Sequence, residues 1–325
     1  MADFMDDALR ANRGPLARCA PQRLHDAIQK VRQQRLSAFL SLLARHSAAP
    51  DASSRTVWPE SKLGSRIGCA LLEHRLRSLA LLAKAGDAIG VARLSSSEEP
   101  LSQVRIGASA AIVAADMAKA LSTTGDEPAY VIGTTSVHSA SDFQVDVAEA
   151  ALQAARKLGD EKALDAVGTV VLLTEHDLFG TSNSWTTRAM PGTIYTDWTA
   201  DPMASGCAFI HEASHLWLNE AFRATRFPAP SDQLYFSPWK GEPRYQLGFL
   251  HAAFAFSMVS IYCARALESQ PAPPTRRVLE MTQERERSRL SLARATLEQA
   301  VQGIDDDVAS TIAAACSIAL NSLRC

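Results

Sequence analysis

The chain has 325 residues, of which 47% are hydrophobic, and its formal net charge at pH 7 is −2. A chain of this length can bury a full core, either as one large domain or as two smaller ones. The near-neutral balance argues against a nucleic-acid partner and against an anionic membrane partner, because proteins that bind either one usually carry a basic excess.

The lack of a recognisable targeting signal and the cysteine pattern both favour a cytoplasmic protein. No uninterrupted apolar run approaches the roughly 20 residues that span a bilayer. The first residues are acidic and lead into no apolar signal segment. The six cysteines include no C-x-x-C pair, so neither a zinc ribbon nor a disulfide framework is indicated. We therefore expect a cytoplasmic protein that has no membrane-spanning segment.

Helices dominate the elements predicted for the first part of the chain. Apolar residues three and four apart predict helices over 21–46 and 62–85. An alanine-rich stretch that runs to about residue 124 predicts a third helix. His25 and His46 lie among charged neighbours, and we expect both on a solvated helix face.

The middle of the chain changes to strand-like sequence. We expect a short strand over 129–133 and a helix over 142–158. Segments 168–174 and 192–198 are short and rich in β-branched residues, which is typical of strands. These two strands precede a histidine-containing helix and offer a place where an extended peptide could pair through its main chain.

The last part of the chain is again predicted to be helical. Pro243 is expected at the first position of a helix, where its missing N–H is not needed. A charged helix over 276–303 and an alanine-rich helix over 307–323 complete the chain. The predicted fold class is mainly α with a small β-sheet (α+β).

We expect one catalytic domain over residues 1–325 with three parts. They are a helical N-terminal scaffold (1–125), a metal-site core (165–265) and C-terminal helices (276–325).

The motif that carries chemistry is His211-Glu212-Ala213-Ser214-His215. Side chains four residues apart on a helix project from the same face, so both imidazoles can reach one divalent metal ion. Glu212 is placed to take a proton from a metal-bound water or to support the ligands. Apolar neighbours predict that the site is shielded from bulk water, while two histidines buried only for packing remain the alternative.

A metal centre of this kind needs a third protein ligand and open positions. Leu218 and Ala221 stand where one peptidase pattern has a glycine and a third histidine, so that pattern is absent. Glu220 would point away from the helix face of the pair, and Glu242 and Glu268 have no local motif to support them. His251, in an apolar helix that follows a polar loop, is the best candidate for the third ligand.

Arg244 is a candidate for binding an anionic co-substrate. It lies seven residues before His251, which on a continuous helix is two turns, or roughly 10 Å, along the same face. An arginine in that position could bind the far carboxylate of a small dicarboxylic acid whose other end chelates the metal. An arginine that simply faces solvent at a helix start is the alternative.

Three blocks of sequence resemble the HExxH-type 2-oxoglutarate-dependent peptide β-hydroxylases. They are Gly192-Thr-Ile-Tyr, Ala208-Phe-Ile-His-Glu-Ala-Ser-His-Leu-Trp-Leu-Asn and, most specifically, Ser237-Pro-Trp-Lys-Gly-Glu-Pro-Arg followed by Gly248-Phe-Leu-His-Ala-Ala-Phe-Ala-Phe. The resemblance covers roughly residues 165–265.

The resemblance implies an iron(II)-dependent oxygenase that uses 2-oxoglutarate and O₂. Its substrate would be a ribosomally synthesised precursor peptide, hydroxylated at a side-chain β-carbon. On this interpretation His211, His215 and His251 hold the iron, Arg244 binds 2-oxoglutarate, and Glu212 either supports the ligands or is itself one of them.

Two other functions stay open at this point. In a zinc-dependent HExxH metallopeptidase, Glu212 would activate water and His251 or a glutamate would be the third ligand, since imidazoles accept zinc as readily as iron. A peptide-binding protein with a structural metal would use the strands near 169 and 194 instead. The Ser-Pro-Trp block and Arg244 favour the oxygenase, because a peptidase has no need of a dicarboxylate anchor.

Overall fold

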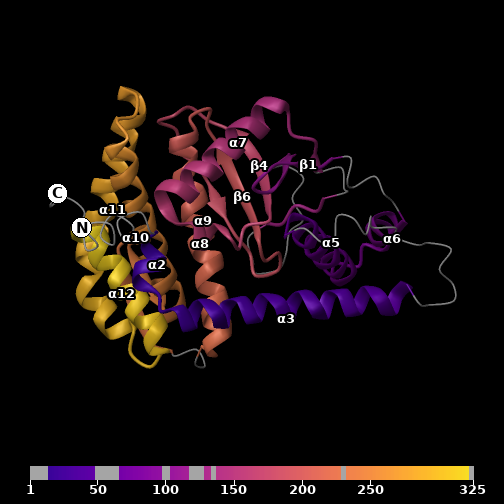
Figure 1. The fold of residues 1–325 in the computed structure, drawn as a ribbon, viewed down its shortest axis with the longest axis horizontal. Coiled ribbons are helices and arrows are strands. Elements are labelled where there is room, and N and C mark those ends of the chain that lie inside the picture. Colours follow the sequence, from indigo (N-terminus) through magenta and orange to yellow (C-terminus); the bar gives the residue numbers. More distant parts are fainter. Residues whose placement is uncertain are drawn as a thin grey trace, which may run out of the picture. The chain divides into compact units, whose positions relative to one another are not determined.

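A computed structural model describes residues 14–47, 66–96, 103–116, 128–132, 137–227 and 232–321. Predicted features at 1–13, 48–65, 97–102 and 117–127 lie outside the described residues. The chain divides into two compact units: unit 1 comprises 1–31, 151–166 and 203–325, and unit 2 comprises 32–150 and 167–202. Long helices and a small mixed sheet confirm the predicted α+β class (Figure 1).

Unit 2 holds the sheet and the helices beside it in the sequence. Helix α3 (Gln22–Ser47), which begins in unit 1, α5 (Arg66–Lys84) and α7 (Asp142–Ala154) confirm three predicted helices, and α6 (Ala88–Ser96) adds a short one. The last residues of α7 belong to unit 1, as do the π-helical turn η4 (Ala155–Asp160), which continues this helix, and α8 (Glu161–Leu164), which follows it.

Within the described residues, six strands form one mixed sheet in the order β1-β2-β4-β6-β5, and β3 also pairs with β2. β2 (Ala111–Ala115), β4 (Thr169–Glu175) and β6 (Thr193–Trp198) run parallel at its centre, and their residues are buried except at the end of β4. β1 (Arg105–Ile106), β3 (Val137–His138) and β5 (Ser184–Trp185) are short antiparallel partners. Burial on both faces is typical of central parallel strands, and β4 and β6 confirm the two strands predicted from β-branched residues.

Two predicted elements of this unit are wrong. The alanine-rich stretch expected to be helical contains strands β1 and β2, so residues 1–125 are not a purely helical scaffold. Alanine favours helices in isolation, but Ile112 and Val113 lie fully buried in the sheet, and pairing with β4 outweighs that propensity. In the described part of 129–133, Ala129 forms only an isolated bridge rather than a strand.

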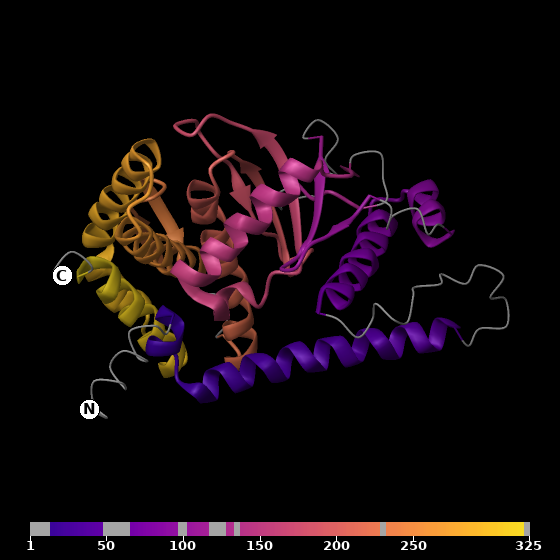
Figure 2. The same cartoon turned by 45° about the horizontal axis from the view of Figure 1, so that its top comes forward.

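Unit 1 is mainly helical. It contains α2 (Pro15–Cys19), α9 (Pro202–Thr225), whose Pro202 belongs to unit 2, α10 (Gln246–Glu268), α11 (Pro273–Ala300) and α12 (Asp306–Asn321). A hairpin of β7 (Leu234–Ser237) and β8 (Glu242–Tyr245) connects α9 to α10. Helices α10, α11 and α12 pack side by side in both views (Figures 1 and 2).

Helix α10 is the core helix of this unit. Among the described residues it alone is long and apolar enough to cross a membrane, but most of that apolar stretch is buried inside the protein. It does not begin at Pro243 as predicted: Pro243 belongs to strand β8, and the helix begins at Gln246. The hairpin therefore occupies the residues that were expected to form the first helical turn.

Helix α11 presents a regular buried seam. Its buried residues from Leu279 onward alternate spacings of four and three, which is the seven-residue repeat of packed helices. They are Leu279, Gln283, Glu286, Leu290, Ala293, Leu297 and Ala300. Two polar side chains, Gln283 and Glu286, thus occupy positions that are usually apolar.

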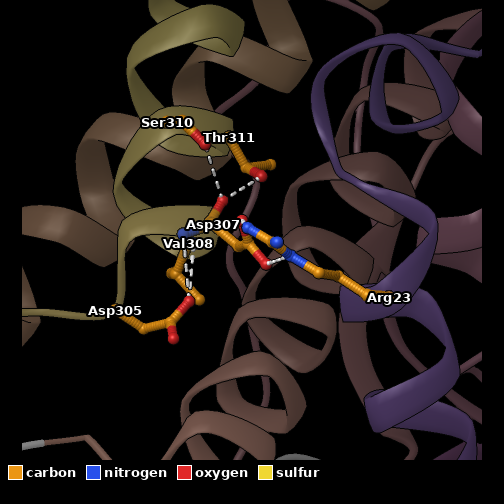
Figure 3. Close-up of polar contacts among 6 residues, drawn as sticks. All are labelled: Arg23, Asp305, Asp307, Val308, Ser310 and Thr311. Carbon is orange, nitrogen blue, oxygen red and sulfur yellow. Dashed lines mark hydrogen bonds and ion pairs between the residues drawn. The ribbon is translucent and has the colours of Figure 1, made fainter.

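The N-terminal end of α3 is bound to the start of α12. Figure 3 shows Arg23 donating through two nitrogens to the carboxylate of Asp307, while Asp305 accepts from the backbone N–H groups of Asp307 and Val308. His25 follows on α3 and is buried, with its ring 6.3 Å from that of Trp217, so the predicted solvated position is wrong. The side chain of His46 lies outside the described residues.

Candidate metal centre

Helices α9 and α10 bring the candidate residues together. The Tyr262 hydroxyl donates to the backbone carbonyl of Met203, and side-chain contacts join Cys207 to Cys263, His211 to Phe256 and His215 to His251. Because the first half of α9 contacts the later part of α10 and His215 contacts the earlier His251, the two helices run antiparallel. A Cβ atom at Gly206 would lie 2.2 Å from the Tyr262 hydroxyl, so the approach of the helices requires glycine there.

The histidine pair on α9 has the geometry that its spacing predicts. Nε2 of His211 lies 3.1 Å from Nε2 of His215, and the two rings are perpendicular with centroids 4.6 Å apart. Two bonds of about 2.0–2.1 Å to one metal ion would place the nitrogens roughly 2.9–3.4 Å apart for angles between a right angle and the tetrahedral angle. The pair therefore fits two ligands of a single metal ion.

Desolvation keeps both partly buried imidazoles neutral, which is the form that binds metals. Desolvation lowers the pKa of His211 well below its usual value, and charge on His215 and His251 would lower it further. Desolvation also lowers the pKa of His215 to about 4. At neutral pH both rings keep a free lone pair for a metal ion.

His251 joins the pair from helix α10, but from the other side of His215. Its Nδ1 lies 3.0 Å from Nδ1 of His215, the nitrogen opposite the one that faces His211. Within the described residues, no group of three or more histidine, cysteine or acidic side chains is arranged to hold a metal ion. His251 would become the third ligand only after its ring or that of His215 turns.

Glu212 lies in a buried position beside the pair of His211 and His215. Its side chain is buried, and Oε1 is 3.8 Å from Nε2 of His211. This distance is too long for a hydrogen bond. It leaves the carboxylate close enough to act on a water molecule bound near the histidines or to become a further ligand.

Arg244 reaches α10 from strand β8, so the predicted two-turn helical spacing to His251 is wrong. The residue pairs with Tyr235 across the hairpin, and its side chain lies against Gly248: a Cβ atom there would be 3.6 Å from Nε of Arg244. Gly248 and His251 are three residues apart and share a face of α10. The partly exposed guanidinium pairs with Glu242 at 3.6 Å and remains accessible to an incoming carboxylate.

Aromatic side chains complete the site. The contacts among them were not predicted from the sequence. Phe256 packs on His211 with ring centroids 4.5 Å apart, and Trp239 of the Ser-Pro-Trp loop stacks on Phe256. Glu286 of α11 accepts a hydrogen bond from the Trp239 indole. Four more aromatic residues of α9 and α10 are also buried: Phe209, Trp217, Phe249 and Phe254. The seven-residue repeat of α11 is the signal that could have marked Glu286 as a buried position, although it does not predict the contact with Trp239.

Comparison with known protein families finds no family model that matches this chain, and comparison with curated proteins finds no match. The assignment of a function therefore rests on the geometry of the site and on the sequence blocks described above.

Proposed function

We propose that the protein is an iron(II)- and 2-oxoglutarate-dependent oxygenase that hydroxylates a side-chain β-carbon in a ribosomally synthesised peptide. The observation that carries the proposal is the 3.1 Å approach of the Nε2 atoms of His211 and His215, with His251 in hydrogen-bond contact with the pair. The Ser237-to-Phe256 block, which resembles the peptide β-hydroxylases, supplies the substrate class.

In this proposal His211 and His215 hold the iron, and His251 joins them after a ring turn. Iron with 2-oxoglutarate and O₂ supplies the oxidation of an unactivated C–H bond. The protein contributes imidazoles whose desolvation lowers their pKa values and so reduces competition from protons at neutral pH. It also contributes Phe256 and its aromatic neighbours, which exclude water from one side of the histidines.

Arg244 would bind the far carboxylate of 2-oxoglutarate. Its guanidinium lies over Gly248, one helical turn before His251 on the same face of α10. A planar guanidinium suits two parallel hydrogen bonds to a carboxylate. Because Glu242 is its only ion-pair partner among the described residues and is 60% exposed, exchange of that carboxylate for a co-substrate is feasible.

Glu212 supports a second candidate, a zinc-dependent metallopeptidase. Its buried carboxylate lies 3.8 Å from the ligand nitrogen of His211, where a general base for a metal-bound water would be expected. In a peptidase, however, Arg244 beside Gly248 would have no role. This difference makes Arg244 the residue that separates the two candidates.

The test is an anaerobic titration of the iron(II)-loaded protein with 2-oxoglutarate, monitored by the visible charge-transfer band of the chelate. We expect the band in the wild type and about a 10-fold or greater loss of 2-oxoglutarate affinity in Arg244→Ala, because a charged bidentate hydrogen bond is removed. Metal content should stay unchanged in this variant. In the same experiment His251→Ala should lose stoichiometric iron.

Three outcomes would contradict this proposal. No band, together with tight zinc binding and cleavage of a generic peptide, would favour the peptidase. Loss of metal in Arg244→Ala would show that the arginine does not act on the co-substrate. Retention of iron in His251→Ala would point to a carboxylate as the third ligand.

A further inference from the structure

Trp239, Phe256 and His211 form a continuous aromatic stack. The indole of Trp239 is parallel to the ring of Phe256, with an interplanar angle of 5° and centroids 5.4 Å apart. Phe256 in turn lies 4.5 Å from the imidazole of His211. The hairpin turn is thereby connected to the candidate metal centre through side chains of the same unit.

A buried carboxylate fixes the outer end of this stack. The side chain of Glu286 is fully buried and accepts hydrogen bonds from Nε1 of Trp239 at 3.0 Å, Nε of Arg285 at 2.6 Å and an NH of Arg289 at 3.1 Å. It occupies a seam position of the α11 repeat, where leucine would pack without burying a charge. Replacing a buried, paired carboxylate by a well-packed apolar side chain is often neutral or stabilising, so the pairing of Glu286 is weak evidence for a stability role alone.

The ring of His211 needs an external support. A metal-bound histidine is usually oriented by a hydrogen bond from its second ring nitrogen. Nδ1 of His211 is buried, and it has no hydrogen-bond partner among the described residues. The ring of Phe256 is the aromatic contact that His211 makes outside the histidine pair, and it limits rotation of this imidazole from that side.

We propose that Glu286 is a positioning residue of the metal centre. By holding the indole of Trp239, it presses Phe256 against His211 and keeps Nε2 of His211 turned toward that of His215. The inference rests on the metal centre of the proposed function and does not depend on the co-substrate. Glu286 itself touches neither a metal ligand nor a substrate atom.

The experiment measures the cobalt(II) dissociation constant of the full chain by its visible absorption and by competition with a chromophoric chelator. A group that orients a ligand directly contributes about 10–100-fold in metal affinity. Since Glu286 acts through two rings, we expect roughly 3–10-fold weaker binding in Glu286→Leu and in Trp239→Phe. The double variant should lose no more than either single variant, because both remove the same hydrogen bond.

Two further variants separate positioning from general stability. Glu286→Gln keeps an acceptor oxygen for the indole and should recover most of the cobalt affinity. Leu297→Ala removes another buried side chain of the α11 seam, eleven residues or roughly 16 Å farther along the helix. It should lower the thermal unfolding midpoint while leaving the cobalt dissociation constant unchanged.

Each alternative result has a defined meaning. Unchanged affinity in Glu286→Leu, additive losses in the double variant or an equal loss in Leu297→Ala would overturn the inference. A wild type that binds no cobalt would overturn both this inference and the proposed function. A wild type that binds cobalt and responds to Glu286→Leu, but does not bind 2-oxoglutarate, would overturn the proposed function alone.

Discussion

Two histidines, one in each unit, have lowered pKa values for the same reason, desolvation, but have different partners. In unit 2, Nδ1 of His74 lies 3.1 Å from the hydroxyl of Thr193, and its Nε2 accepts from the backbone N–H of Ile132 at 3.5 Å. In unit 1, Nε2 of His211 faces another imidazole instead. Desolvation lowers the pKa of both histidines. What distinguishes them is the partner, because His74 has a hydroxyl and a backbone group, whereas His211 has a second potential ligand.

Substitution of His74 should give the largest effect on stability and none on metal binding. His74→Leu leaves the Thr193 hydroxyl and the Ile132 N–H without their buried partner, which we expect to cost about 2–3 kcal/mol in the free energy of unfolding. The cobalt(II) dissociation constant should not change. Chemical denaturation and cobalt titration of the same sample check both statements, and a weakened cobalt site would show that His74 also affects the site.

The pH dependence of the unfolding free energy tests the assignment of His74 as a buried, neutral histidine. The expected effect is smaller than that of the substitution. The folded-state pKa of His74 is about 3, below the unfolded value near 6.5. Above pH 6.5 the ring is neutral in both states, whereas between pH 6.5 and 3 only the unfolded chain takes up the proton. The unfolding free energy should therefore fall on acidification by at most about 1.4 kcal/mol per pH unit from this group.

On acidification Asp160 changes the unfolding free energy in the opposite direction to His74. The effect of His74 must therefore be measured as a difference between two proteins. Burial raises the pKa of the Asp160 carboxyl to about 6, although three backbone N–H groups donate to it. Between pH 6 and its unfolded value near 3.8, acidification therefore stabilises the fold through this group. Subtracting the His74→Leu profile from the wild-type profile isolates the histidine. Equal slopes below pH 6.5 would contradict the assigned pKa of His74.

The parts of the site that could be predicted from sequence are those set by local geometry. The approach of His211 and His215 follows from the period of one helix, which fixes side chains four residues apart on one face. The position of Arg244 could not be obtained that way. Pro243 is compatible with both a helix start and a strand of a hairpin, and only pairing between β7 and β8 decides between them.

Long-range contacts account for the other differences. His25 has charged neighbours in sequence, yet its ring packs on Trp217 of a distant helix. The alanine-rich composition of Ala111–Ala115 favours a helix, but the segment forms a strand because it pairs with the parallel strand β4. Glu286 gains its role from an indole on another element, which a helix pattern alone does not reveal. In each case the deciding partner is remote in the sequence.

The most direct test of the metal centre is the iron(II) stoichiometry of the full chain, measured by anaerobic equilibrium dialysis for the wild type and for His211→Ala. We predict one iron per wild-type chain and no stoichiometric iron in His211→Ala, with His74→Leu retaining the wild-type value. A wild type that binds no iron, or a His211→Ala variant that keeps it, would contradict the assignment of the α9 histidine pair as a metal centre.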